Sequence, residues 1–145
     1  MLPRWHIFSG LIFSLLLKLI LPDIGWFYIS LVFLASFLID FDHYAASVLK
    51  TGKLSLLKSF EYHRKQEIIE QRERKKGIRR KGDFHLFHTI EFHLIVFVLG
   101  FVWVGFWYIL AGMVFHSILD LISMGYERVL YRREFLLINW IRNKF

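Results

Sequence analysis

The feature that most constrains the fold is a run of 28 residues without a formal charge, from Phe92 to Leu119. The apolar character begins near Phe84 and continues to Met124. A single helix of that length would be ~60 Å long, about twice the ~30 Å hydrocarbon core of a membrane. Two helices joined by a tight turn fit better. Gly100 and Gly105 bracket that turn, because glycine accepts a positive φ.

A second apolar block occupies the N-terminal part of the chain. Residues 5–21 are mostly apolar, Pro22 and Asp23 favour a turn, and residues 24–39 carry no charge. No small-x-small cleavage site precedes Pro22, so we interpret the first segment as a retained anchor rather than a signal peptide. The sequence predicts an all-α integral membrane protein with four short transmembrane helices in two hairpins, near residues 6–21, 25–43, 85–101 and 106–124.

The composition agrees with lipid contact. Hydrophobic residues make up 56% of the chain and aromatic residues 19%, while charged residues are only 21%. A soluble domain usually has about 45–50% apolar and about 25% charged residues. The absence of cysteine excludes disulfides and thiolate metal sites.

The positive charge is concentrated between the two apolar blocks. Residues 44–83 contain twelve Lys or Arg and five Asp or Glu, and this difference equals the net charge of +7. We expect a basic loop of amphipathic and charged helices there. The predicted organisation is a first transmembrane hairpin, a basic cytoplasmic or interfacial loop, and a second hairpin with a basic tail, all in one domain: residues 1–43, 44–83 and 84–145.

Basic residues also predict the orientation in the membrane. With four spans, both termini and the loop share one side, which then holds eighteen of the 19 Lys and Arg residues. Basic segments favour the cytoplasm, so we expect a multi-pass protein of the cell (inner) membrane with both termini cytoplasmic. The loop is expected to bind anionic headgroups of membrane lipids and to carry no catalytic group; a solvated face is the alternative. Nucleic acid is not expected as a partner, because the loop lacks an aromatic platform.

Ionisable side chains in membrane segments are costly, and here they converge at one depth. In an antiparallel hairpin, residues at equal distances from the turn lie level. A first turn centred near residue 24 places His6 level with Asp42, and a second turn near residue 103 places His88 between His116 and Asp120.

Their helical spacing predicts a metal site. Asp40 with His43 and His88 with Glu91 are spaced i,i+3, and His116 with Asp120 is spaced i,i+4, so each pair shares a helix face. Imidazoles with carboxylates suit Zn²⁺ first, with Mn or Fe as alternatives. Each pair alone is also explained by an interfacial carboxylate or a hydrogen bond between helices. The predicted ligands are Asp40, Asp42, His43, His88, Glu91, His116 and Asp120, together with His6; His85 stays open, His93 is expected to pack elsewhere, and His63 to be solvated.

Four motifs together resemble the YdjM-like family of small membrane-bound metal-dependent hydrolases of bacteria and archaea. They are His6-x-x-x-Gly10, Asp40-Phe41-Asp42-His43, His88-Thr89-Ile90-Glu91, and Gly112 to His116 followed by Asp120. The family's middle motif commonly reads His-Arg-Gly-x-Thr-His, and this chain resembles a branch with His-x-x-Glu instead. The resemblance implies a membrane fold and a hydrolase activity, and it favours His88 with Glu91 as site residues.

The predicted function is a metal-dependent hydrolase at the cytoplasmic membrane face. A bound cation would activate water and polarise a phosphoryl or carbonyl oxygen, and a carboxylate that is not a ligand (Asp42, Glu91 or Asp120) would act as general base. The location suits a lipid or lipid-linked phosphate as substrate. The alternative is a non-catalytic, metal-stabilised membrane scaffold or a small transporter.

Overall fold

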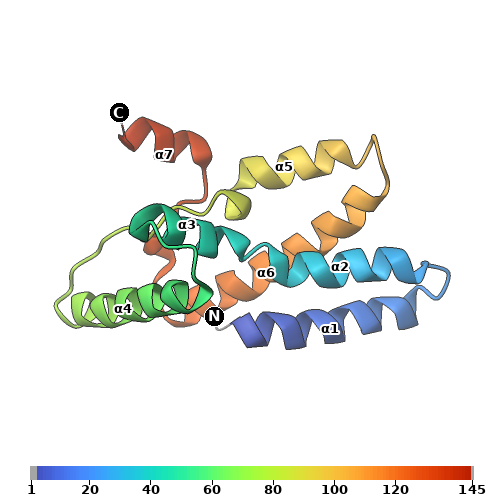
Figure 1. Cartoon of the computed structure of the whole chain (residues 1–145). Helices are drawn as coiled ribbons and strands as arrows, with labels where there is room; N and C mark the ends of the chain where they lie inside the picture. The colour runs from blue at the N-terminus through green and yellow to red at the C-terminus, as the bar shows by residue number, and fades with distance from the viewer. Residues whose placement is uncertain (1–2, 145) are drawn as a thin grey trace.

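The computed structural model describes residues 3–144, and these residues form helices and no strand (Figure 1). The all-α prediction is therefore confirmed. Seven α-helices and two short 3₁₀ helices follow one another along this part of the chain: α1 (Pro3–Ile20), α2 (Trp26–Leu38), α3 (Phe41–Thr51), α4 (Leu56–Lys75), η1 (Leu86–His88), α5 (Ile90–Leu99), α6 (Gly105–Tyr126), η2 (Leu130–Arg132) and α7 (Leu137–Lys144).

Two antiparallel hairpins, α1–α2 and α5–α6, build the bundle. The most extensive packing is between α2 and α6, followed by that of α1 on α2. Both hairpin turns lie at one end of the molecule, and both ends of the chain lie toward the other, together with α3, α4 and α7 (Figure 1).

Glycines let the central helices approach closely. A Cβ atom at Gly112 would overlap the carbonyl oxygen of Val32, and one at Gly10 would overlap the side chain of Ser36. The contacts therefore bring α1 and α6 against the same turn of α2. His6 and His116 each lie four residues from one of these glycines, which places both rings beside the C-terminal end of α2.

The bundle buries polar side chains and exposes apolar ones. The core cluster of buried hydrophobic residues contains only Ile39, Val96 and Met113. Large apolar side chains along α1 and α5 remain exposed, among them Leu19 and Val98. The buried polar or charged residues are His6, Ser14, Ser36, Asp42, Ser47, Ser59, His88, Thr89, His116, Asp120 and Arg132.

Two of the four predicted spans meet the length and composition expected of a membrane helix. Within residues 3–144 these are Trp26–Thr51, in which α2 and α3 follow one another almost without interruption, and Gly105–Tyr126. Helix α5 is apolar, but its 10 residues cover ~15 Å, about half of a hydrocarbon core. The prediction of four full spans is therefore corrected to two.

The second hairpin differs from its prediction at both ends. Helix α5 begins at Ile90 rather than near residue 85, because the Thr89 side chain accepts a hydrogen bond from the Phe92 N–H and caps the helix. The turn does lie between Gly100 and Gly105, but Gly100 has a φ of −58°, so its backbone is ordinary. What glycine provides there is room, since a Cβ atom would lie 2.6 Å from the Trp107 ring.

The basic segment forms helices α3 and α4, which are connected through Gly52. Gly52 and Gly77 follow α3 and α4 with φ values of 68° and 70°, the left-handed conformation that ends many helices. Tyr62 on α4 donates a hydrogen bond to Asp83 at 2.7 Å, which fixes the returning loop against that helix.

Four consecutive residues, 132–135, connect most of the molecule. Arg132 lies 3.2 Å from Glu70 of α4, Arg133 donates to Asp120 of α6 at 2.7 Å, and Glu134 lies 3.2 Å from Lys81. The carbonyl oxygen of Phe135 accepts the N–H of Ile90, the first residue of α5. The predicted basic appendage is thus tied to the C-terminal segment along its length.

Candidate metal centre

The break between α2 and α3 creates the first part of the centre. The Asp40 N–H donates to the carbonyl of Phe37, three residues earlier. The carbonyl of Ser36, which a continuing helix would use at this position, instead accepts a hydrogen bond from His116 Nδ1 at 2.8 Å. The change in direction places Asp40, Asp42 and His43 at the start of α3, facing the bundle.

A second local motif positions His88. This residue ends the 3₁₀ turn η1, directly before the Thr89 cap of α5. Its Nδ1 lies 3.0 Å from Asp42 Oδ2, which also accepts the backbone N–H of Phe87 at 3.0 Å. Because a carboxylate only accepts, His88 Nδ1 carries the proton.

The two histidines therefore present their other ring nitrogens to each other. His116 Nδ1 donates to a backbone carbonyl and His88 Nδ1 donates to Asp42, so both Nε2 atoms keep a lone pair in the neutral rings. These two Nε2 atoms lie 3.2 Å apart and are fully buried. Two lone pairs held at this distance need a cation or an additional proton between them.

Two carboxylates complete a four-atom cage. Asp40 Oδ1 lies 3.4 Å from His116 Nε2 and 3.7 Å from His88 Nε2. Asp120 Oδ2 lies 3.6 Å and 3.8 Å from the same atoms. Tetrahedral ligands ~2.0–2.1 Å from a Zn²⁺ ion are ~3.3–3.4 Å from one another. The four donors fit a divalent cation after shifts of a few tenths of an ångström.

Asp120 is held by two further partners. His6 Nε2 lies 3.2 Å from Asp120 Oδ1, and the His6 ring stacks on the His116 ring with centroids 3.9 Å apart. Arg133 donates to Asp120 Oδ2 at 2.7 Å. His6 is thus placed to orient Asp120 and to cover His116 from the α1 side.

A second group of donors adjoins the first. His43 Nε2 lies 3.4 Å from Asp40 Oδ1, and the His43 ring stacks on the His85 ring at 3.7 Å. His85 Nδ1 lies 3.6 Å from Asp42 Oδ1. Candidate ligand groups therefore comprise His88–His116–Asp120, His6–Asp40–His116, Asp40–His43–His88 and Asp42–His43–His85.

Glu91 does not join this cluster, and its prediction as a metal or catalytic residue was wrong. Its two carboxylate oxygens accept the backbone N–H groups of Leu137 at 2.9 Å and Ile138 at 3.2 Å. The residue thus caps the start of α7. The i,i+3 spacing from His88 failed because the chain is not one helix across Thr89.

Two further histidines lie where their helices take them. His93 Nδ1 contacts the carbonyl of Thr89 at 2.9 Å and its Nε2 contacts Ser117 at 3.2 Å, outside the cluster. His63, which was expected to be solvated, is half-buried, and its Nε2 lies 3.0 Å from the carbonyl of His43.

Sequence reasoning missed Arg133 as a residue of the centre. It belonged to what looked like a basic tail, and no spacing rule connects it to Asp120. The motif with a usable signal was His85, one helical turn before His88, although the residues between them form a 3₁₀ turn rather than an α-helix.

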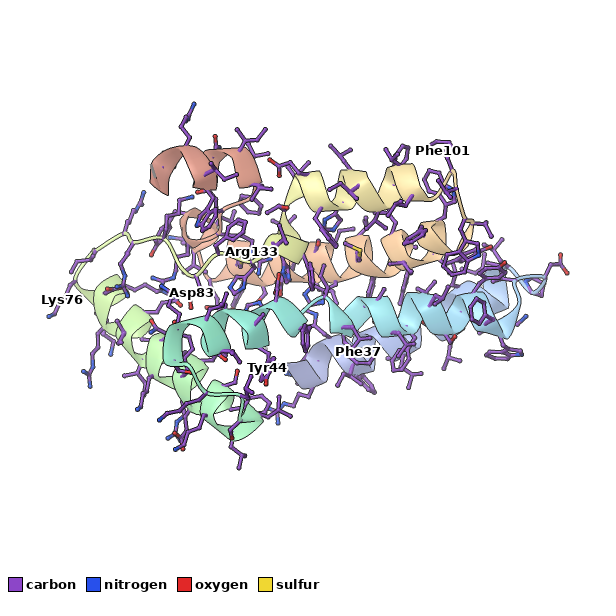
Figure 2. All side chains as sticks on the ribbon, turned by 45° about the horizontal axis from the view of Figure 1, so that its top comes forward. Phe37, Tyr44, Lys76, Asp83, Phe101 and Arg133 are labelled. Atoms are coloured by element: carbon purple, nitrogen blue, oxygen red, sulfur yellow. The ribbon has the colours of Figure 1, made fainter. Side chains whose placement is uncertain are left out.

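Two cavities of different character adjoin the centre. A polar cavity of about 600 Å³ lies beside α4 and the returning loop, and His43, His85, Lys50, Arg80 and Arg133 contribute to its wall. An apolar cavity of about 400 Å³ lies between α5 and α6, lined by Leu94, Phe97, Leu110, Leu121, His88 and Arg133 among others. Arg133 is common to both, and Figure 2 shows it between the ends of the molecule marked by Lys76 and Phe101.

Ionisable groups on α4 are perturbed on the polar side of the centre. Burial, together with the hydrogen bond to Asp83, raises the pKa of Tyr62 to about 12. Burial also raises the pKa of Glu70. Basic residues at this cavity are paired with acids, as in the contacts of Arg80 with Glu73 at 3.1 Å and of Lys50 with Asp83 at 3.8 Å.

The chain matches no protein-family model, no curated protein and no solved structure. The resemblance based on sequence motifs therefore stays a prediction, and function is inferred from the arrangement of residues 3–144.

Proposed function

We propose that this protein is a membrane-embedded metal-dependent hydrolase of the YdjM-like kind, acting on a lipid or lipid-linked phosphate. The observation that carries the proposal is the pair of His88 and His116 Nε2 atoms, 3.2 Å apart, with both Nδ1 protons already donated elsewhere. Fixing the tautomer through Nδ1 is how metal-binding histidines are usually oriented. Asp40 and Asp120 supply the oxygen donors.

The residues of the chain then have separate roles. A divalent cation, Zn²⁺ first, would supply Lewis-acid activation of water and of a phosphoryl or carbonyl oxygen. Asp42 is a positioning residue, because it holds the His88 ring through Nδ1. Arg133 neutralises charge at Asp120 and faces both cavities, where it can bind an anionic substrate group.

The two cavities favour an amphiphilic substrate. A phosphate group would lie near Arg133 in the polar cavity, and an acyl or isoprenoid chain would lie between α5 and α6 in the apolar one. The exposed apolar surface of α1 and α5 and the buried polar interior suit a protein surrounded by lipid. We place it in the cell (inner) membrane with both termini cytoplasmic.

Metal analysis of the detergent-purified protein tests the centre. After dialysis against Zn²⁺ and then buffer, we expect bound zinc in the wild type and its loss in His88→Ala and His116→Ala. His93→Ala is the matched control, because this half-buried histidine lies outside the cluster. A wild-type protein that is folded and free of zinc would instead assign the Nε2 pair to a shared proton and end the proposal.

Activity is tested with phosphatidic acid in mixed micelles beside the soluble ester p-nitrophenyl phosphate. We expect metal-dependent phosphate release, faster for the lipid. Asp42→Ala separates an enzyme from a scaffold: a variant that folds and loses turnover supports catalysis, whereas fold and metal lost together with no wild-type turnover support the scaffold.

The orientation is tested by cysteine labelling. The chain contains no cysteine, so Arg79→Cys would introduce a unique thiol in the basic segment. Labelling of this thiol from outside intact cells would contradict the cytoplasmic placement.

A further inference from the structure

Two buried polar atoms beside the centre have no hydrogen-bond partner. They are Asp42 Oδ1 and His85 Nδ1, and they lie 3.6 Å apart. The other oxygen of Asp42 is satisfied twice, by His88 Nδ1 and by the Phe87 N–H. The carboxylate is thus fixed in orientation with its second oxygen directed toward His85.

Leaving such atoms unpaired is unfavourable. A buried donor or acceptor without a partner costs about 1–3 kcal/mol, and more for a charged group. A separation of 3.6 Å is too long for a hydrogen bond. It is close to the ~3.4 Å expected between two ligands of one tetrahedral cation.

A third ligand lies beside these atoms. The His43 ring stacks on the His85 ring at 3.7 Å, and one nitrogen of His43 lies within 4.8 Å of the Asp42 and His85 donor atoms. Asp40 Oδ1 lies 3.4 Å from both His43 Nε2 and His116 Nε2, so this oxygen stands between the two groups of donors.

We propose that Asp42, His43 and His85 form a second divalent-cation position, with Asp40 as the carboxylate shared with the first. The proposal rests on the first position assigned above and makes the centre binuclear. In such centres two cations ~3.5–4 Å apart can act on one phosphoryl group from both sides, which fits a phosphate ester better than a carboxylic ester.

The two positions differ in access. The rings of His88 and His116 are fully buried, whereas His43 and His85 contribute to the wall of the polar cavity. We therefore expect the second cation to exchange with solution and to leave first when a chelator is added. The substrate phosphate would meet it from the polar cavity.

Stoichiometry tests the second position, with Zn²⁺ as the probe in equilibrium dialysis of the full-length protein. We expect two zinc ions per wild-type chain and one in His85→Ala and in Asp42→Asn. Asp42→Asn is the sharper variant, because its amide oxygen can still accept from His88 while its NH₂ group donates to His85. His93→Ala should keep two.

A second readout uses Mn²⁺. Two Mn²⁺ ions sharing a carboxylate give an exchange-coupled electron paramagnetic resonance spectrum, and Asp42→Asn should convert it to that of an isolated ion. One zinc per chain in the wild type, unchanged in both variants, would overturn the second position and leave the first intact. No zinc in the folded wild type would overturn both. Loss of all zinc in folded Asp42→Asn would assign Asp42 to the first position only.

Discussion

The helices meet through apolar contacts at the end marked by Phe101 in Figure 2 and through polar contacts toward the end marked by Lys76. At the first end, Trp107 packs edge-on against Phe97 and Phe101, with centroids 4.6 Å and 5.2 Å apart. Toward the second, Arg132 and Arg133 pair with carboxylates of α4 and α6. Apolar contacts of the first kind tolerate substitution, whereas the polar ones depend on specific partners.

This difference teaches where chemistry is located in the molecule. Exposed apolar side chains such as Phe101 and Val102 surround the hairpin turn, and the buried carboxylates and histidines lie toward the other end. The apolar end holds the helices together, and the polar end holds ligands in fixed directions. Substitutions can separate these two contributions.

The largest effect is expected where the two ends are coupled, at Gly112. Gly112→Leu would drive a side chain into the Val32 carbonyl and separate α2 from α6. We expect a loss of at least about 3 kcal/mol in unfolding free energy, because overpacking of this kind displaces backbone. Bound zinc should fall with it. Gly125→Ala on the same helix is the control, since open space surrounds Gly125; equal unfolding profiles for both variants would contradict the close-contact role.

The next effect concerns the polar end alone. Arg132→Ala would leave Glu70 and Glu73 without their partner and release η2 from α4. We expect about 2–3 kcal/mol of destabilisation, reduced from a fully buried pair because both carboxylates are partly exposed. Limited proteolysis should then cut within residues 76–82. Lys58→Ala removes an exposed ion pair on the same helix and should leave the cleavage pattern unchanged.

A smaller effect is expected at Glu91, and it sharpens the assignment of roles. Glu91→Gln keeps the oxygen acceptor for one N–H of α7 and removes the charge that favours that helix start. We expect a small fall in melting temperature with zinc content and turnover retained. Loss of zinc in this variant, with the fold intact, would return Glu91 to the metal centre.

The smallest effect depends on pH. The pKa of Tyr62 is raised from 10.0 to about 12, mainly by burial and then by its hydrogen bond to Asp83, so the folded state favours the neutral phenol. The stabilising contribution is complete below pH 10 and is lost as the pH rises through 12. Tyr62→Phe should lower stability by at most about 1 kcal/mol at pH 8 and by less at alkaline pH. An equal deficit at pH 8 and pH 11.5 in denaturant titrations would contradict this linkage.

Simple hairpin geometry predicted much of the centre from the sequence. Equal distances from two turns placed His6, Asp42, His88, His116 and Asp120 at one level, and all five belong to the observed cluster. That reasoning needs only the positions of the turns, which glycine and proline mark clearly in the sequence.

The remaining features depend on contacts that no local pattern encodes. Glu91 was misplaced because the Thr89 cap starts a new helix, so facing directions do not carry across from His88. Arg133 was missed because its contact with Asp120 joins a non-helical segment to α6. Four full spans were expected because hydropathy alone does not locate the start of α5 at Ile90.

The contacts of residues 132–135 have a consequence for the order of synthesis. A ribosome adds ~5–20 residues per second from the N-terminus, so helices α1–α6 are made before this segment. Until it emerges, Asp120 lacks Arg133, the first N–H of α5 lacks the Phe135 carbonyl, and α4 lacks Arg132. We therefore expect the bundle to assemble first, and the centre to gain its final geometry only when synthesis has passed residue 135.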